Sequence, residues 1–190
     1  TGAIELEQAR LSEYLSFDFR DPGDWCGLTT WNDVEPLAVV DGALVLRPTG
    51  HDPWLVFCDR GGDGEAGWVD QEYFTHFELA GRWSTPFAWT PVEFYWQDRE
   101  GPTGTDGFGV RGNAVHSGPV VEADTGVWQR VVIPLAQASD SWGGEDSPAV
   151  LGRGIRIDPA VFQAGVPFSS EARISVDFFR LRPARTWGPS

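Results

Sequence analysis

The chain of 190 residues contains no lysine and no methionine, and all 14 of its cationic side chains are arginine. Against 28 aspartate and glutamate residues, these arginines leave a formal net charge of −14 at pH 7. A surface of this charge repels phosphate backbones and anionic lipids, so we expect neither nucleic acid nor a membrane as a partner. Acidic substrates are disfavoured for the same reason, unless arginine side chains gather locally.

Motifs that carry chemistry are also scarce. The three histidines are scattered, without the H-x-H or H-E-x-x-H spacing of a metal site. The two cysteines, Cys26 and Cys58, show no C-x-x-C spacing, and the sequence leaves open whether they form a disulfide. There is no G-x-S-x-G motif, no phosphate loop and no apolar run of membrane-spanning length.

Long helical segments are rare because 23 glycines and 14 prolines interrupt the chain. Residues 1–15 are the exception, and we expect them to form a short helix or an extended arm. Residues 16–190 are expected to form one domain, because no internal repeat or second boundary is visible. An apolar content of 41% with turn residues throughout predicts an all-β fold.

Short segments with strand character recur along the domain. They are 16–20, 37–47, 53–59, 72–83, 92–98, 107–116, 127–135, 153–158 and 172–182. Asp41-Gly42 is a hairpin signal that divides the second segment into two strands. The Gly-, Asp- and Trp-rich stretches between strands, 21–36 among them, are predicted loops. Strands at this spacing predict two packed antiparallel sheets, a β-sandwich of the jelly-roll kind.

Five segments taken in order carry a family resemblance. They read SFDFRDPGDW, VVDGALVLRPTGHDPWLV, GVWQRVVIPLAQASDSWGG, GIRIDP and ISVDFFRL. In this order they resemble the β-sandwich carbohydrate-binding modules, the galactose-binding-like jelly rolls appended to polysaccharide-degrading enzymes. The resemblance covers nearly all of residues 16–183. It implies an extracellular protein, either a monomer or a module of a larger enzyme, whose partner is a polysaccharide or oligosaccharide.

The resemblance also implies a structural Ca²⁺ near the chain ends. Its ligands would be Asp18 in the first strand and Asp177 in the last, with Asp41 as a further ligand. Carboxylate oxygens suit a hard cation. The sequence departs from the family at Arg20, where these modules often carry an acidic residue.

Two strand segments predict a polar binding face. In VEFYWQD (92–98), alternation directs Val92, Phe94 and Trp96 to a core and the intervening residues away from it. In EYFTHFELAGRW (72–83), alternation gives a second polar face. If the two strands pair, both faces join in one sugar-binding groove for a neutral ligand; an ordinary solvated sheet face is the alternative. The groove residues would be His76, Glu78, Arg82, Glu93, Tyr95, Gln97 and Arg111.

Ten tryptophans are more than a small core requires. We expect Trp96 in the core, because it alternates with Val92 and Phe94. We also expect Trp128 in the core, where it would share a face with Arg130 and Val132. Six others lie in or beside predicted loops: Trp31, Trp54, Trp68, Trp83, Trp89 and Trp142. Trp68 and Trp142 stand in Gly- and acid-rich loops, where an indole is well suited to stack on a sugar ring.

The main prediction is a non-catalytic module that binds a neutral polysaccharide, and two alternatives stay open. Glu78 and Glu93 on adjacent strands would suit a glycoside hydrolase, whose mechanism needs two facing carboxyl groups. A polysaccharide lyase would use the His, Arg, Tyr and Gln side chains of the same groove. A structural domain with no sugar affinity is the third possibility, because one fold hosts many functions.

Overall fold

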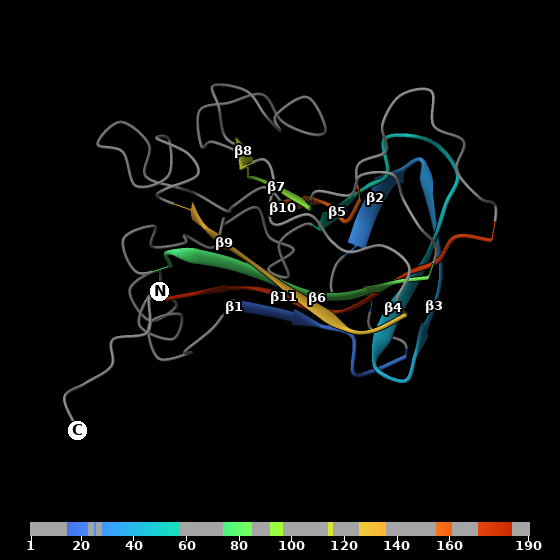
Figure 1. The fold of residues 1–190 in the computed structure, drawn as a ribbon, viewed down its shortest axis with the longest axis horizontal. Helices are drawn as coiled ribbons and strands as arrows, with labels where there is room; N and C mark the ends of the chain where they lie inside the picture. The colour runs from blue at the N-terminus through green and yellow to red at the C-terminus, as the bar shows by residue number, and fades with distance from the viewer. Residues whose placement is uncertain are drawn as a thin grey trace.

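The computed structural model describes most of the predicted strands and the turns that join some of them (Figure 1). Every element in the described part of the chain is a strand. Of the predicted arm or helix at residues 1–15, residues 1–14 lie outside this part, as do both cysteines, and Leu15 begins a strand. The described residues are 15–22, 25, 28–57, 74–84, 92–96, 114–115, 126–135, 155–160 and 171–183.

Six strands form one sheet, which we call sheet A. Its order is β3-β4-β11-β6-β9, and β1 pairs with β11 beside β4. β4 pairs with residues 174–176 of β11, and β1 with residues 178–181, so the two share one edge of that long strand. The bounds are β1 (Leu15–Asp18), β3 (Val34–Val40), β4 (Ala43–Pro48), β6 (His76–Trp83), β9 (Gln129–Pro134) and β11 (Ile174–Arg182).

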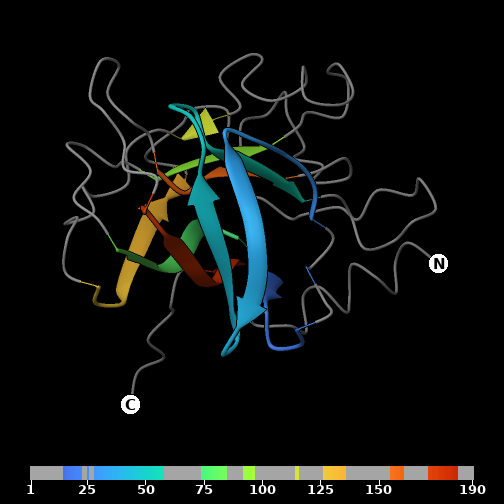
Figure 2. The same ribbon diagram turned by 90° about the vertical axis from the view of Figure 1, so that its right-hand side faces the viewer.

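Five strands form sheet B, in the order β2-β5-β10-β7-β8. They are β2 (Leu28–Asn32), β5 (Trp54–Phe57), β10 (Ile155–Asp158), β7 (Glu93–Trp96) and β8 (Ala114–Val115). Between β4 and β11 the chain crosses from one sheet to the other at each step except β7 to β8. This path gives the two four-stranded sets β4-β11-β6-β9 and β5-β10-β7-β8 of a jelly roll, which confirms the predicted fold (Figures 1 and 2).

The Asp41-Gly42 turn joins β3 to β4 as predicted. Both residues have positive φ, 51° and 80°, the geometry that a two-residue hairpin with the twist of its strands requires. The predicted loop at 21–36 is wrong for part of its length, because Leu28–Asn32 form the edge strand β2. In the described sheet β2 pairs only with β5, about twenty-five residues later in the chain. Because this pairing is not local, the residues around β2 indicate a strand only weakly.

Aromatic rings join the two sheets in the core. Phe17 and Phe179 of sheet A stack with ring centroids 4.5 Å apart, and Phe179 lies 4.7 Å from Phe57 of sheet B. Phe77 of sheet A stacks on Phe94 of sheet B at 4.5 Å. These contacts add specific geometry to the burial of large apolar area that holds a sandwich together.

The strand alternation predicted from the sequence is confirmed for β6 and β7. Phe77 and Leu79 of β6 are buried in the core, as are Phe94 and Trp96 of β7 and the preceding Val92. The alternate residues of both strands therefore face outward, away from the space between the sheets.

Two predictions about tryptophan are corrected. Trp83 was expected beside a loop, but it is buried at the end of β6, where its Nε1 donates to the Pro159 carbonyl at 2.9 Å. Trp128 was expected in the core, but it is 45% exposed, and the Arg82 guanidinium lies over its ring at 5.2 Å. Trp128 lies two residues before Arg130, so alternation places it with Arg130 on the outer side of sheet A and not in the core. In the part of the chain described, no helix is long and apolar enough to cross a membrane.

Candidate functional site

The predicted groove divides between two faces of the molecule. β6 pairs with β11 and β9 in sheet A, whereas β7 pairs with β10 and β8 in sheet B, so the predicted pairing of these two strands is wrong. His76, Glu78 and Arg82 therefore lie on the outer side of sheet A, and Glu93 and Tyr95 lie on the outer side of sheet B. The reason is that consecutive strands of a jelly roll often change sheets.

The division also removes both catalytic arrangements considered from the sequence. Glu78 and Glu93 lie on the outer sides of different sheets of the sandwich, so they cannot flank one glycosidic bond. The proposed lyase set is split in the same way, with His76 and Arg82 on one side and Tyr95 on the other. Its members Gln97 and Arg111, and the loop tryptophans Trp68 and Trp142, lie outside the described residues.

The predicted calcium ligands do not come together as a metal group. Across the described strands and turns, no three His, Cys, Asp or Glu side chains are arranged to hold an ion. Asp18 forms an ion pair with Arg20 at 3.6 Å, and Asp41 occupies the β3–β4 turn. Calcium binding by Asp18, Asp41 and Asp177 stays a prediction.

The outer side of sheet B carries a cluster centred on Arg156, which we call the Arg156 face: Asp52, Trp54, Glu93, Tyr95, Arg156 and Asp158. Strand register brings most of its members together, because Arg156 of β10 lies opposite Tyr95 of β7, and Asp158 lies opposite Glu93. Side chains opposite each other on one sheet face are close enough to interact. Trp54 belongs to β5, the neighbour of β10 on its other side.

Arg156 contacts both acidic and aromatic neighbours. It donates two hydrogen bonds to Asp158, from Nε at 2.7 Å and from Nη2 at 2.6 Å. Its Nη2 is also 3.6 Å from an Asp52 oxygen. The guanidinium carbon lies 5.0 Å from the Trp54 ring centroid and 4.6 Å from that of Tyr95, so two π systems help to hold it.

A tight loop fixes Asp52 and the start of β5. The Asn32 side-chain amide donates to the Asp52 carbonyl at 2.9 Å, and the Asp52 amide donates to a carboxylate oxygen of Asp33 at 3.0 Å. Asp33 itself has a φ of 47°. A Cβ on Gly50 would come within 2.1 Å of the Asp33 Cγ, so a larger residue there would displace this carboxylate. The loop thus positions Trp54 and Asp52 beside Arg156.

Burial and negative charge control ionisation on this face. Burial raises the pKa of Asp158 to about 7; Arg156 opposes the shift, while the charges of Glu93 and Asp52 add to it. Burial also raises the pKa of Tyr95, whose hydroxyl donates to Glu93 at 2.6 Å. The face therefore combines one guanidinium with three carboxyl groups and two aromatic rings, one of them the phenol of Tyr95.

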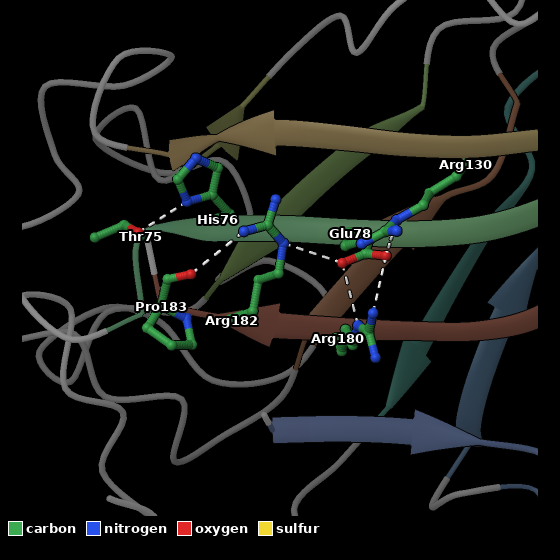
Figure 3. Close-up of polar contacts among 7 residues, drawn as sticks. All are labelled: Thr75, His76, Glu78, Arg130, Arg180, Arg182 and Pro183. Atoms are coloured by element: carbon green, nitrogen blue, oxygen red, sulfur yellow. Dashed lines mark hydrogen bonds and ion pairs between the residues drawn. The ribbon is translucent and has the colours of Figure 1, made fainter. Parts of the chain in front are cut away.

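The outer side of sheet A carries a different group, the Glu78 cluster, composed of His76, Glu78, Arg130, Arg180 and Arg182 (Figure 3). Glu78 of β6 lies opposite Arg180 of β11, and His76 lies opposite Arg182. Arg130 of β9 is opposite Ala80, one step along the same face, and reaches back to Glu78. Two strands, β9 and β11, thus direct three guanidiniums to a single carboxylate on β6.

Contacts in the cluster hold every guanidinium to Glu78. Arg180 donates to both carboxylate oxygens at 3.1 Å, Arg182 donates from Nε at 3.0 Å, and Arg130 forms an ion pair through Nε. Burial alone would raise the pKa of Glu78, but hydrogen bonds and charge from Arg180 and Arg130 outweigh it, and the pKa is lowered. Burial lowers the pKa of His76, and the charge of Arg182 lowers it further.

Several members of both groups were not predicted as site residues. Arg156 was not among the predicted groove residues, and Trp54 was predicted only as a residue in or beside a loop. Arg180 and Arg182 were missed because a bulge between Val176 and Phe178 changes the alternation of β11. Phe178 follows the alternation of Ile174 and Val176 in the sequence, but it lies on the outer side of sheet A, where the Arg180 guanidinium carbon is 4.5 Å from the Phe178 ring centroid.

No family model matches the chain, and no curated protein matches its sequence. Comparison with solved structures finds carbohydrate-binding modules. A low-affinity xylan-binding module of family 86 from Roseburia intestinalis shares 9% identity over 92% of this chain and 98% of its own, with a TM-score of 0.49. A family 29 module from Piromyces equi also shares 9% identity, over 93% and 95%, with a TM-score of 0.49.

A family 30 module of a cellulosomal cellulase from Clostridium thermocellum shares 16% identity with this chain. The match covers 92% of this chain and 95% of that module, with a TM-score of 0.44. Because the TM-scores are below 0.5, the function has to be inferred from the side chains themselves.

Proposed function

We propose that the protein is a non-catalytic carbohydrate-binding module, and that its Arg156 face binds a neutral polysaccharide or oligosaccharide. One observation carries this proposal: Arg156 is held between the rings of Trp54 and Tyr95 on the outer side of a central strand of sheet B. Flat aromatic and guanidinium surfaces suit the C–H faces of sugar rings, and they lose little conformational entropy on binding.

The polar groups of this face match a ligand rich in hydroxyl groups. Carboxylates accept hydrogen bonds from hydroxyls, and the guanidinium and the Asn32 amide are donors to hydroxyl oxygens. Three carboxyl groups surround one arginine, from Asp52, Glu93 and Asp158. This excess of negative charge repels an acidic sugar and favours a neutral one.

Asp158 serves to position Arg156 in this proposal and has no catalytic role. It is 1% exposed and uses both oxygens to accept from Arg156, so it is poorly placed to protonate a glycosidic oxygen. A fixed acceptor of this kind keeps the guanidinium in one orientation before ligand arrives. The role also fits an extracellular protein, because polysaccharides are found there.

Affinity electrophoresis against a panel of neutral polysaccharides, followed by calorimetry on the best oligosaccharide, tests the proposal. We expect retarded migration of the native chain with no release of reducing ends or unsaturated products. Trp54→Ala should weaken binding by about tenfold, the loss expected for one stacking aromatic. Trp128→Ala is the matched control, because Trp128 also stacks with an arginine but lies beside sheet A.

Three results would overturn the proposal. The first is that no neutral polysaccharide retards the chain. The second is equal weakening by Trp54→Ala and Trp128→Ala while the unfolding temperature of each variant stays native. The third is product release, which would replace a binding module with an enzyme.

A further inference from the structure

The Glu78 cluster carries an excess of positive charge within an acidic protein. Three guanidiniums, from Arg130, Arg180 and Arg182, contact the single carboxylate of Glu78. One negative charge cannot balance three positive charges, so the group has a formal charge of +2 when His76 is neutral. The chain as a whole has a net charge of −14. Local charge of the opposite sign, held in fixed geometry, is typical of an anion-binding site.

The layering of the cluster places the positive charge outermost. The Glu78 side chain is 0% exposed, whereas the side chain of Arg130 is 50% exposed. Arg180 and Arg182 are partly exposed between these limits. Figure 3 shows the guanidiniums arranged around the carboxylate, with His76 farther along the same strand. An approaching anion would therefore meet arginine before it met Glu78.

The contacts of Arg130 leave it able to bind a second anion. Among the residues that the structure describes, Arg130 contacts Glu78 through Nε, and its two terminal nitrogens carry further N–H donors. The fork of a guanidinium matches the two oxygens of a carboxylate. The way Arg180 binds both oxygens of Glu78 shows this recognition within the cluster itself.

Among the residues that the structure describes, the other charges on this side of sheet A do not cancel the excess. Arg82 lies farther along β6 and adds positive charge beside Trp128. Asp18 of β1 lies beside Phe178 and is paired with Arg20, and Asp177 is an exposed residue of β11. The pKa of His76 is lowered, first by burial and then by Arg182, which agrees with a positive local potential.

We propose that the Glu78 cluster is a second binding site, which takes the carboxylate of a uronic acid unit in an acidic polysaccharide. Arg130 and Arg182 would donate to the ligand carboxylate, while Glu78 holds the guanidiniums in place. The site is independent of the neutral-sugar site, because it lies on the opposite sheet and selects the opposite charge. Local clustering thus provides the exception to the expectation that this acidic chain avoids acidic ligands.

Affinity electrophoresis in polygalacturonate at low salt tests this site with a defined probe. Highly methyl-esterified polygalacturonate is the neutral match, because it keeps the backbone and removes the charge. We expect the first polymer to retard the native chain and the second to have no effect. Arg130→Gln should weaken binding about tenfold, as expected for one charge-assisted contact.

Arg47→Gln is the matched control for Arg130→Gln. Arg47 is similarly exposed, at 41%, is also paired with a glutamate, Glu35, and its loss changes the net charge by the same amount. It lies on β4, away from the cluster. We expect Arg47→Gln to bind polygalacturonate like the native chain, and both variants to keep native unfolding temperatures.

Equal weakening by the two substitutions would overturn the proposal, since it would show only a response to net charge. Equal binding of the two polymers by Trp54→Ala, in which the neutral-sugar site is weakened, would also overturn it, because the carboxylate would then be irrelevant. So would retardation by dextran sulfate but not by polygalacturonate, which would assign the cluster to sulfate. Retardation by the esterified polymer that Trp54→Ala abolishes would belong to the Arg156 face instead, so the two proposals fail separately.

Discussion

The two outer faces of the sandwich each bury a carboxylate, and they treat it in opposite ways. Asp158 on sheet B is 1% exposed and Glu78 on sheet A is 0% exposed, yet the pKa of Asp158 is raised and that of Glu78 is lowered. The difference lies in the neighbours. Asp158 shares one arginine with Asp52 and lies opposite the charge of Glu93, whereas Glu78 has three arginine partners. Burial alone therefore does not decide ionisation; the balance of nearby charges does.

The largest expected effect comes from removing the Glu78 charge. Glu78→Gln leaves three guanidiniums close together without their shared anion, so we expect the free energy of unfolding to fall by about 2–3 kcal/mol. Urea denaturation at pH 7 measures this change. Arg130 stays partly hydrated, which is why we place the loss below that of a fully buried ion pair.

Glu35→Gln is the control for this substitution. Glu35 pairs with Arg47 at the exposed edge of sheet A, where an ion pair contributes roughly 0–1 kcal/mol. If Glu35→Gln destabilises the protein as much as Glu78→Gln does, the Glu78 cluster contributes no more than a surface pair. The contrast drawn between buried and exposed arginine pairs would then be lost.

The second expected effect is a pH dependence of opposite sign on the two faces. The folded pKa of Asp158, about 7, lies above its ordinary value of 3.8, so its stabilising contribution is complete below pH 3.8 and is lost as pH rises through about 7. The pKa of Glu78 is lowered, so its contribution is present above its ordinary value of 4.5 and is lost as pH falls through the folded value.

Unfolding free energies measured from pH 5 to pH 8 check the first part of this contrast. We expect the native chain to lose on the order of 2 kcal/mol more than Asp158→Asn across this interval. The unfolding free energy of Glu78→Gln should change with pH as that of the native chain does between pH 5 and pH 8, because Glu78 stays ionised throughout this interval. If the unfolding free energy of Asp158→Asn falls with pH as steeply as that of the native chain, another group causes the pH dependence.

The smallest expected effect concerns Arg82 and Trp128, which interact on the exposed side of sheet A. Their cation–π contact at 5.2 Å should couple the two side chains by about 0.5 kcal/mol, because solvent screens such pairs. A double-mutant cycle with Arg82→Ala and Trp128→Ala, followed by thermal unfolding, measures the coupling. Strictly additive losses would show that the contact contributes nothing to stability.

Local reasoning from the sequence was reliable for the faces of strands. The alternation in VEFYWQD places Phe94 and Trp96 in the core and Glu93 and Tyr95 outside, as predicted. It failed where alternation itself is interrupted. The bulge in β11 turns Phe178 outward and brings Arg180 beside Glu78, and a bulge has no clear signature in a single apolar-rich segment.

The sequence by itself determined the all-β class, the hairpin at Asp41-Gly42 and the inward or outward direction of the residues of β6 and β7, because turn geometry and strand alternation depend on neighbouring residues. Only the tertiary structure decided which strands share a sheet. That choice depends on pairing between distant segments, such as β6 with β11 and β7 with β10. It placed Glu78 and Glu93 on different sheets. Glu78 thereby gained three arginine partners, whereas Glu93 lies beside β10, which carries the single arginine Arg156.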